Sequence, residues 1–162
     1  MWSNSQEISV STSLPVPRSI YERAVLFDTC ALEAIADPRD QYHQDATRCL
    51  ATLVQLAYPF YITIPTIVET HRRLLYKPRL GILPALRFLQ SAYDGSTNII
   101  RPLEEDEIQA IEYIKRFQDQ KLTFTDTISM AVMNRLGLRK VFSFDWHFTL
   151  LGFQVIPTTG TN

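Results

Sequence analysis

The stretch from Lys121 to Phe148 most constrains how this chain folds. Its first half is a nearly continuous apolar pattern of helical character, which begins near Thr123 and ends at Gly137. A short apolar strand pattern follows and ends at Asp145. A helix is expected to be buried when it is apolar on more than one side. A strand is expected to be buried on both faces when its sequence lacks polar alternation. The stretch therefore predicts a helix-then-strand unit inside a layered α/β domain, with Asp126 at the helix start.

Apolar runs typical of buried strands alternate with helical patterns along most of the chain. The first run leads directly into Asp28, and Pro65 opens the helical pattern that follows the second strand. This alternation predicts an α/β fold with a mostly parallel sheet, whose right-handed connections bring the carboxyl ends of the strands to one edge. The predicted strands are 24–27, 60–64, 98–101, 140–144 and 153–156, and the predicted helices are 31–35, 43–57, 65–75, 81–93, 102–120 and 123–136.

The length of 162 residues suits one domain with a substantial core. Residues 1–20 are rich in Ser and Pro and poor in hydrophobic side chains, so we expect a flexible N-terminal extension before a domain over residues 21–162. The net charge of −1 gives no general attraction to nucleic acid or to membrane surfaces. We find neither a signal-peptide pattern nor an apolar run long enough to span a bilayer. The two cysteines, Cys30 and Cys49, make no disulfide framework, which favours a reduced, cytoplasmic protein.

Four acidic residues differ from the rest because they lie among apolar or small side chains. They are Asp28, Glu69, Asp126 and Asp145, each close to a predicted strand end or helix start. Since the carboxyl ends of parallel strands share one edge of the sheet, we expect the four carboxylates to converge there. Clustered carboxylates raise one another's pKa unless a cation lies between them. Oxygen ligands alone favour Mg²⁺ or Mn²⁺, and such a site is suited to phosphoryl-transfer chemistry.

Helix capping is the alternative interpretation of each of these acids. The pairs Thr66–Glu69 and Thr123–Asp126 both have the spacing of a capping box. Asp28 and Asp145 could each be a simple N-cap. For any one acid taken alone we favour capping, whereas four such acids at one edge of a sheet favour a bound cation.

The same acids lie in short motifs that resemble those of PIN-domain ribonucleases, most of all the toxins of VapBC-type toxin–antitoxin pairs. The resemblance covers about residues 24–157, and the order and spacing of the motifs both agree with the family. Each motif is weakly specific alone, and the set is fairly specific. The matching segments are Leu26–Leu32, Ile67–Glu69, Leu122–Ser129 and Ser143–Phe148.

The resemblance implies a three-layer α/β/α PIN-like domain with a central, mostly parallel sheet and the strand order 3-2-1-4-5. It implies a metal-dependent endoribonuclease that hydrolyses RNA phosphodiester bonds as the toxin of a toxin–antitoxin pair. Asp28, Asp126 and Asp145 would hold Mg²⁺ or Mn²⁺, and Glu69 would complete the shell or orient the attacking water. RNA would be the substrate, a cognate antitoxin protein would be a partner, and the chain would form a homodimer.

Other functions are weighed against this one. One alternative is a non-catalytic module with the PIN fold, which would bind RNA or protein but would not hydrolyse RNA. A phosphotransferase of haloacid-dehalogenase type also fits Leu26–Thr29, but it needs a second acid where Cys30 stands. A receiver-like signalling domain would need paired acids after the first strand and a lysine after a late strand, and neither is in place.

Several further residues receive provisional roles. We expect Ser143 and Thr29 to support the site by hydrogen-bonding the acids, with backbone capping as the alternative. The cysteines have no neighbour suited to nucleophilic catalysis. The three histidines share no metal-ligand spacing, which indicates helix-surface or packing residues. A basic stretch comprises Arg72, Arg73, Lys77, Arg79 and Arg87. These side chains could contact RNA phosphates, but we favour the interpretation that they form the solvent-exposed faces of two helices. Leucines that could anchor an antitoxin, or serve only the core, are Leu74, Leu75, Leu83, Leu86 and Leu89.

Overall fold

Five parallel strands form the central sheet of the computed structural model, which describes residues 18–158. The strand order is β3-β2-β1-β4-β5, as the resemblance implied. Because β1 lies in the middle, its residues are buried on both faces of the sheet, which explains its lack of polar alternation. The strands are β1 (Val25–Phe27), β2 (Phe60–Thr63), β3 (Thr97–Ile100), β4 (Lys140–Phe142) and β5 (Gln154–Ile156).

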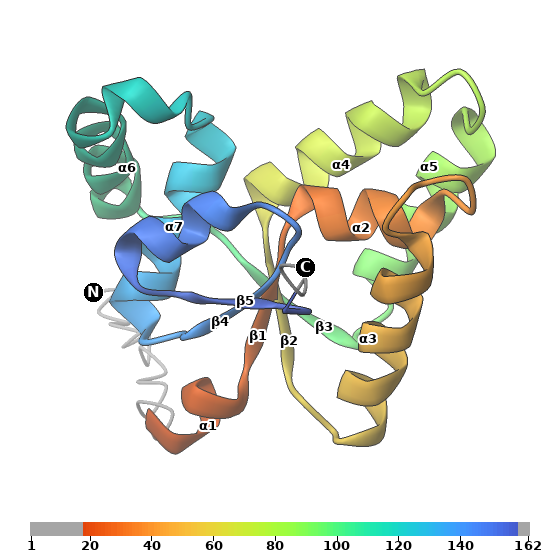
Figure 1. Ribbon diagram of the computed structural model, residues 1–162, viewed down its shortest axis with the longest axis horizontal. Helices are drawn as coiled ribbons and strands as arrows, with labels where there is room; N and C mark the ends of the chain where they lie inside the picture. Colours follow the sequence, from red (N-terminus) through yellow and green to blue (C-terminus); the bar gives the residue numbers. More distant parts are fainter. Residues whose placement is uncertain (1–17, 159–162) are drawn as a thin grey trace, which may run out of the picture.

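Helices cover both faces of this sheet, so the predicted three-layer α/β/α architecture is confirmed (Figure 1). One layer holds α2 (Thr29–Ala36), α3 (His43–Gln55), α4 (Ile64–Tyr76) and α5 (Ile82–Ala92). The other holds α6 (Glu104–Arg116), α7 (Phe124–Leu136) and the 3₁₀ helix η2 (Trp146–Leu151). The short helix α1 (Arg18–Arg23) precedes β1, and the 3₁₀ helix η1 (Gln118–Gln120) joins α6 to α7.

Two apolar cores lie on opposite faces of the sheet, and neighbouring strand residues contribute to different ones. Leu26 and Val141 pack with α7 and η2 in the first core, whereas Phe27 and Phe142 pack with α2 and α4 in the second. Helix α7 is buried over seven consecutive residues, as its nearly all-apolar sequence predicted. It ends at Gly137, whose left-handed backbone (φ 73°) suits glycine.

Most sequence-based boundaries lie within one or two residues of the observed ones, and three differences matter for the site or the domain limits. Strand β4 ends at Phe142 rather than at residue 144, because the amide of Phe144 leaves the sheet and donates to Cys30 Sγ. Helix α6 ends at Arg116 rather than at residue 120, and η1 follows it. Helix α1 begins at Arg18, inside the predicted extension. Residues 1–17 and 159–162 lie outside the described part, so the flexible extension stays a prediction.

Within residues 18–158 no helix combines the length and the apolar character that crossing a bilayer requires.

We predict that Phe142→Ala destabilises the protein by about 3–5 kcal/mol, because it leaves a cavity beside Phe27 and Phe144 in a fully buried position. Urea denaturation followed by circular dichroism measures this change. Ile82→Ala is the control, because Ile82 is 70% exposed and its loss should change stability by less than about 0.5 kcal/mol. Equal effects of the two substitutions would contradict the assignment of the core.

Candidate active site

Asp28 lies at the carboxyl end of β1 and is almost completely buried. Its Oδ2 accepts hydrogen bonds from Ser143 Oγ at 2.7 Å and from the Cys30 thiol at 2.9 Å. Although Asp28 occupies the N-cap position of α2, its side chain makes no capping hydrogen bond, so capping does not account for this acid. Burial raises the pKa of Asp28, and repulsion from Asp145 adds to the rise.

Asp126 stands in the first turn of α7, where the predicted capping box is present. Its amide donates to Thr123 Oγ1 at 3.1 Å, and its Oδ2 accepts from the Thr123 amide at 3.2 Å and from the Thr123 hydroxyl at 2.6 Å. Capping alone would favour the charged carboxylate. Burial and the nearby charge of Asp28 outweigh it and raise the pKa of Asp126 to about 6. Asp126 is therefore the N3 partner of the Thr123 cap and is also repelled by a second acid.

Asp145 follows β4 and caps η2, where its Oδ1 accepts from the His147 amide at 3.0 Å. The His147 ring contacts the same oxygen through Nδ1 at 2.5 Å. The interpretation of the histidines as helix-surface or packing residues is wrong for His147, which lines the same cavity as the acids. The pairing could not be read from metal-ligand spacing because it is a local contact between residues two apart.

Glu69 lies on α4, and the predicted capping box with Thr66 is wrong. The cap of α4 is Thr63, whose Oγ1 accepts from the Thr66 amide at 3.3 Å. Since α4 begins at Ile64, Glu69 stands beyond the first turn and cannot reach the cap. It instead pairs with Arg73, one helical turn further on, at 3.7 Å.

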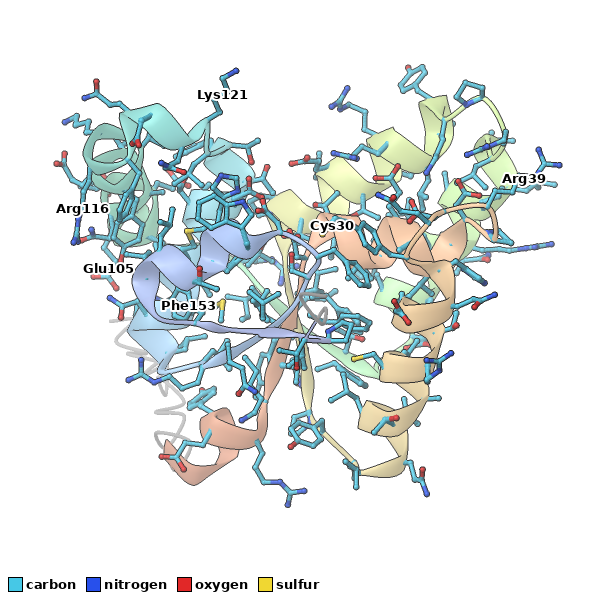
Figure 2. All side chains as sticks on the ribbon, viewed as in Figure 1. Cys30, Arg39, Glu105, Arg116, Lys121 and Phe153 are labelled. Atoms are coloured by element: carbon cyan, nitrogen blue, oxygen red, sulfur yellow. The ribbon has the colours of Figure 1, made fainter. Side chains whose placement is uncertain are left out.

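All four predicted acids line one cavity of about 200 Å³ at the carboxyl edge of the sheet. They come from four segments far apart in sequence, which the parallel topology brings together. Figure 2 shows Cys30 near the middle of this edge, at the start of α2, and Lys121 projecting at the edge near α7. The cavity is completed by Thr29, Cys30, Arg73, Lys121, Leu122, Thr123 and His147.

Ser143 connects two of the acids. Its hydroxyl donates to Asp28 Oδ2 and accepts from the Asp145 amide at 2.9 Å, so one side chain fixes the ends of β1 and β4 relative to each other. The expectation that Thr29 bonds an acid finds no support in the described contacts, where Thr29 Oγ1 is buried without a hydrogen-bond partner. The sequence motifs gave no role to Cys30, which contacts both Asp28 and Ser143. No signal near Cys30 predicts its contact with Ser143, 113 positions away.

The other buried acids of the described chain have cationic partners. Asp106 accepts from Arg135 at 2.8 Å through both oxygens, and Asp37 contacts Lys77 at 2.9 Å and Arg79 at 3.3 Å. Glu33 contacts Arg73 at 2.7 Å and Lys77 at 2.9 Å. Lys77 is half-buried and pairs with acids, so the interpretation of the basic stretch as solvated helix faces is wrong for Lys77. Arg73 and Arg79 pair with acids too, but they are exposed, as that interpretation expected. Arg72 and Arg87 are exposed, as that interpretation expected.

Asp28 and Asp126, by contrast, have no Lys or Arg within ion-pair distance among residues 18–158, and Asp145 has only His147. No group of three or more His, Cys, Asp or Glu side chains in this range stands arranged to hold a metal ion. The donor set nevertheless suits a hard divalent cation, because it consists of carboxylates, and burial raises the pKa of two of them, Asp28 and Asp126.

A family model for the PIN domain matches residues 25–154, and the chain belongs to that family. The matched range contains all four acids and all five strands except the last two residues of β5. No curated protein matches the chain.

Solved structures show the same fold. VapC20 of Mycobacterium tuberculosis, a toxin that cleaves the sarcin–ricin loop, is 24% identical with a TM-score of 0.71, over 80% of this chain and 96% of that one. FitAcB of Neisseria gonorrhoeae is 16% identical with a TM-score of 0.59, over 81% and 95% of the two chains. PAE2754 of Pyrobaculum aerophilum is 21% identical with a TM-score of 0.51, over 82% and 90%.

We predict that Asp126→Asn stabilises the protein at pH 7.5 by about 1–2 kcal/mol. The pKa of Asp126 rises from 3.8 to about 6 on folding, so the charged form opposes folding. The stability that its proton confers is present below about pH 4 and is lost as the pH rises through 6. Two pKa units correspond to about 3 kcal/mol, which partial exposure to solvent reduces.

Chemical denaturation at pH 4 and at pH 7.5 measures this effect, with Asp119→Asn, an exposed position, as the control. The difference between Asp126→Asn and the parent should nearly vanish at pH 4. A difference of the same size at both pH values would show that the charge of Asp126 is not its cause.

Proposed function

We propose that this protein is a metal-dependent endoribonuclease of the toxin type. The observation that carries the proposal is the contrast between its buried or half-buried acids. Glu33, Asp37 and Asp106 each have an arginine or lysine partner, whereas Asp28 and Asp126 have none in the described chain. Buried carboxylates without partners are costly, and a divalent cation is the partner that a PIN-type arrangement of acids would suit.

The residues take distinct roles in this proposal. Asp28, Asp126 and Asp145 hold Mg²⁺ or Mn²⁺, and Glu69 completes the shell or orients the attacking water. The cation, when bound, supplies the Lewis acidity that phosphodiester hydrolysis needs. Ser143 keeps Asp28 and the start of η2 in register, so that the carboxylates stay at one edge. No side-chain nucleophile is required, and burial keeps the Cys30 thiol protonated because it raises the thiol's pKa.

The similar structures suggest the substrate and partner classes. One of them is a toxin that cleaves the sarcin–ricin loop, which is RNA, and another is the complex FitAB bound to DNA. By analogy we assign RNA as the substrate, a cognate antitoxin as the partner and the cytoplasm as the place of action. The free cysteines Cys30 and Cys49 agree with a reducing compartment.

A second candidate is the non-catalytic PIN module. It is favoured by one observation, the two hydrogen bonds that Asp28 Oδ2 already accepts from Ser143 and Cys30. If these bonds are never exchanged for a cation, the site holds the fold together and does not catalyse hydrolysis.

We predict that Asp28→Asn lowers RNA cleavage by more than about 100-fold while the protein stays folded, because a metal ligand is lost and a buried charge removed. The assay uses end-labelled total tRNA with Mg²⁺ or Mn²⁺ and a parallel lane with EDTA. Asp119→Asn is the matched control and should cleave as the parent does. Cleavage by Asp28→Asn at the parental rate would refute the assignment of the site.

The homodimer and the antitoxin contact are proposed for the outer face of α4 and α5. Of the leucines named as anchors, Leu74 is fully buried and serves the core. Leu83 and Leu86 of α5 are exposed, as are Ile82 of the same helix and Val68 and Tyr76 of α4. An apolar group of this kind is typical of a protein–protein contact.

We predict that Leu83→Glu combined with Leu86→Glu weakens self-association, because each substitution places a charge in an apolar contact. Light scattering of the parent over a range of concentrations should give the mass of a dimer, and the double variant that of a monomer. A parent that is monomeric throughout would contradict the proposed dimer.

A further inference from the structure

Arg73 is a cation on the wall of the cavity that the four acids line. It lies on α4, one turn after Glu69, and lines the same space as Asp28, Asp126 and Asp145. Its side chain is 45% exposed, so it is accessible to a ligand. An RNA strand that enters this cavity brings negative charge toward four carboxylates, and a nearby cation offsets part of that repulsion.

The guanidinium of Arg73 is held on one side only. Its Nε and Nη2 both lie 2.7 Å from Glu33 Oε2. Its Nη1 lies 3.7 Å from Glu69 Oε1, which is too long for a hydrogen bond. Half of the group is thus fixed by a buried carboxylate, and Nη1 keeps its N–H donors for another acceptor.

Glu33 has a second basic partner besides Arg73. Its other oxygen, Oε1, lies 2.9 Å from the Nζ of half-buried Lys77, which also lies 2.9 Å from Asp37 Oδ2. Although burial acts to lower the pKa of Lys77, its hydrogen bonds to Asp37 and Glu33 raise it, so the lysine stays charged. Glu33 thus shares Lys77 with Asp37, while its other oxygen, Oε2, contacts both Nε and Nη2 of Arg73 and so fixes the direction of the guanidinium.

Lys121 is the other basic residue with a permanent charge on the cavity, and it is less suited to this role. It is exposed and makes no hydrogen bond through its ammonium within residues 18–158. A long side chain without a fixing partner loses more conformational entropy when it binds a phosphate, whereas a prepositioned guanidinium loses little.

We infer that Arg73 binds a phosphate of the RNA strand beside the proposed cleavage site, and that Glu33 positions it. This inference rests on the proposed function, since it names the substrate contact of the same site. Because Arg73 contributes to the binding of RNA rather than to the hydrolysis step, its loss should raise KM more than it lowers kcat.

The test is RNA binding without cleavage. Labelled total tRNA is titrated in EDTA with the parent, Arg73→Gln, Arg73→Lys and Arg72→Gln, over KCl concentrations of roughly 50–300 mM. Arg72 is the matched control because it is the exposed neighbour on α4 and has no ion pair in the described chain. Melting temperatures of all four proteins show whether each variant is folded.

We expect Arg73→Gln to bind about 10-fold more weakly at low salt, as the loss of one charge-assisted hydrogen bond implies. The slope of log K against log salt should fall by about 0.7, the value for one phosphate contact on a single strand. Arg73→Lys should keep the slope, because the charge remains, and lose part of the affinity. Arg72→Gln should stay within about twofold of the parent.

Two kinds of failure can be told apart. If the parent binds and cleaves RNA while Arg73→Gln matches Arg72→Gln in affinity and slope, the inference about Arg73 is wrong and the proposed function stands. If the parent neither binds nor cleaves RNA, the proposed function fails and the phosphate site fails with it. A folded Arg73→Lys with the slope of Arg73→Gln would also overturn the inference, because the charge would then have no part in binding.

Discussion

Buried Asp28 and half-buried Asp126 have no lysine or arginine partner in the described chain, and the proposed site depends on this charge imbalance. The parallel topology of the sheet causes this imbalance. It places Asp28 after β1, Asp145 after β4 and Asp126 at the start of α7, all at the same edge of the sheet. Burial raises the pKa of both aspartates, and repulsion from Asp145 adds to each rise. Elsewhere the chain pairs its buried acids with arginine or lysine, so the imbalance is a local property of this edge.

Two hydrogen-bonding systems hold the surroundings of the acids in place. Ser143 and Cys30 tie the end of β1 to the segment after β4, across the middle of the sheet. On the other side, Glu33 of α2 contacts Arg73 of α4 and Lys77, which directly follows α4, and these contacts hold the two helices together beside the cavity. The site therefore sits between two rigid supports, which agrees with a site that must hold acids close together against their repulsion.

Patterns local in sequence predicted the fold and the positions of the acids well. The apolar run of α7, its stop at Gly137 and the Thr123–Asp126 capping box all depend on residues within one element. Contacts between distant segments were not predictable in this way. In the sequence, Glu33 resembles an ordinary helix-surface acid, and its contact with Arg73, 40 positions away, depends on how α4 packs against α2. The N-cap of α4 is Thr63 rather than Thr66 because of where β2 ends.

Calorimetric titration of Mn²⁺ into the protein at pH 7.5 tests most directly whether these aspartates form a cation site. We predict saturable binding that is lost in Asp28→Asn and weakened at pH 5.5, where protons compete for Asp126. Binding that is unchanged in Asp28→Asn, or no binding at all, would contradict the cation site and would favour the non-catalytic module.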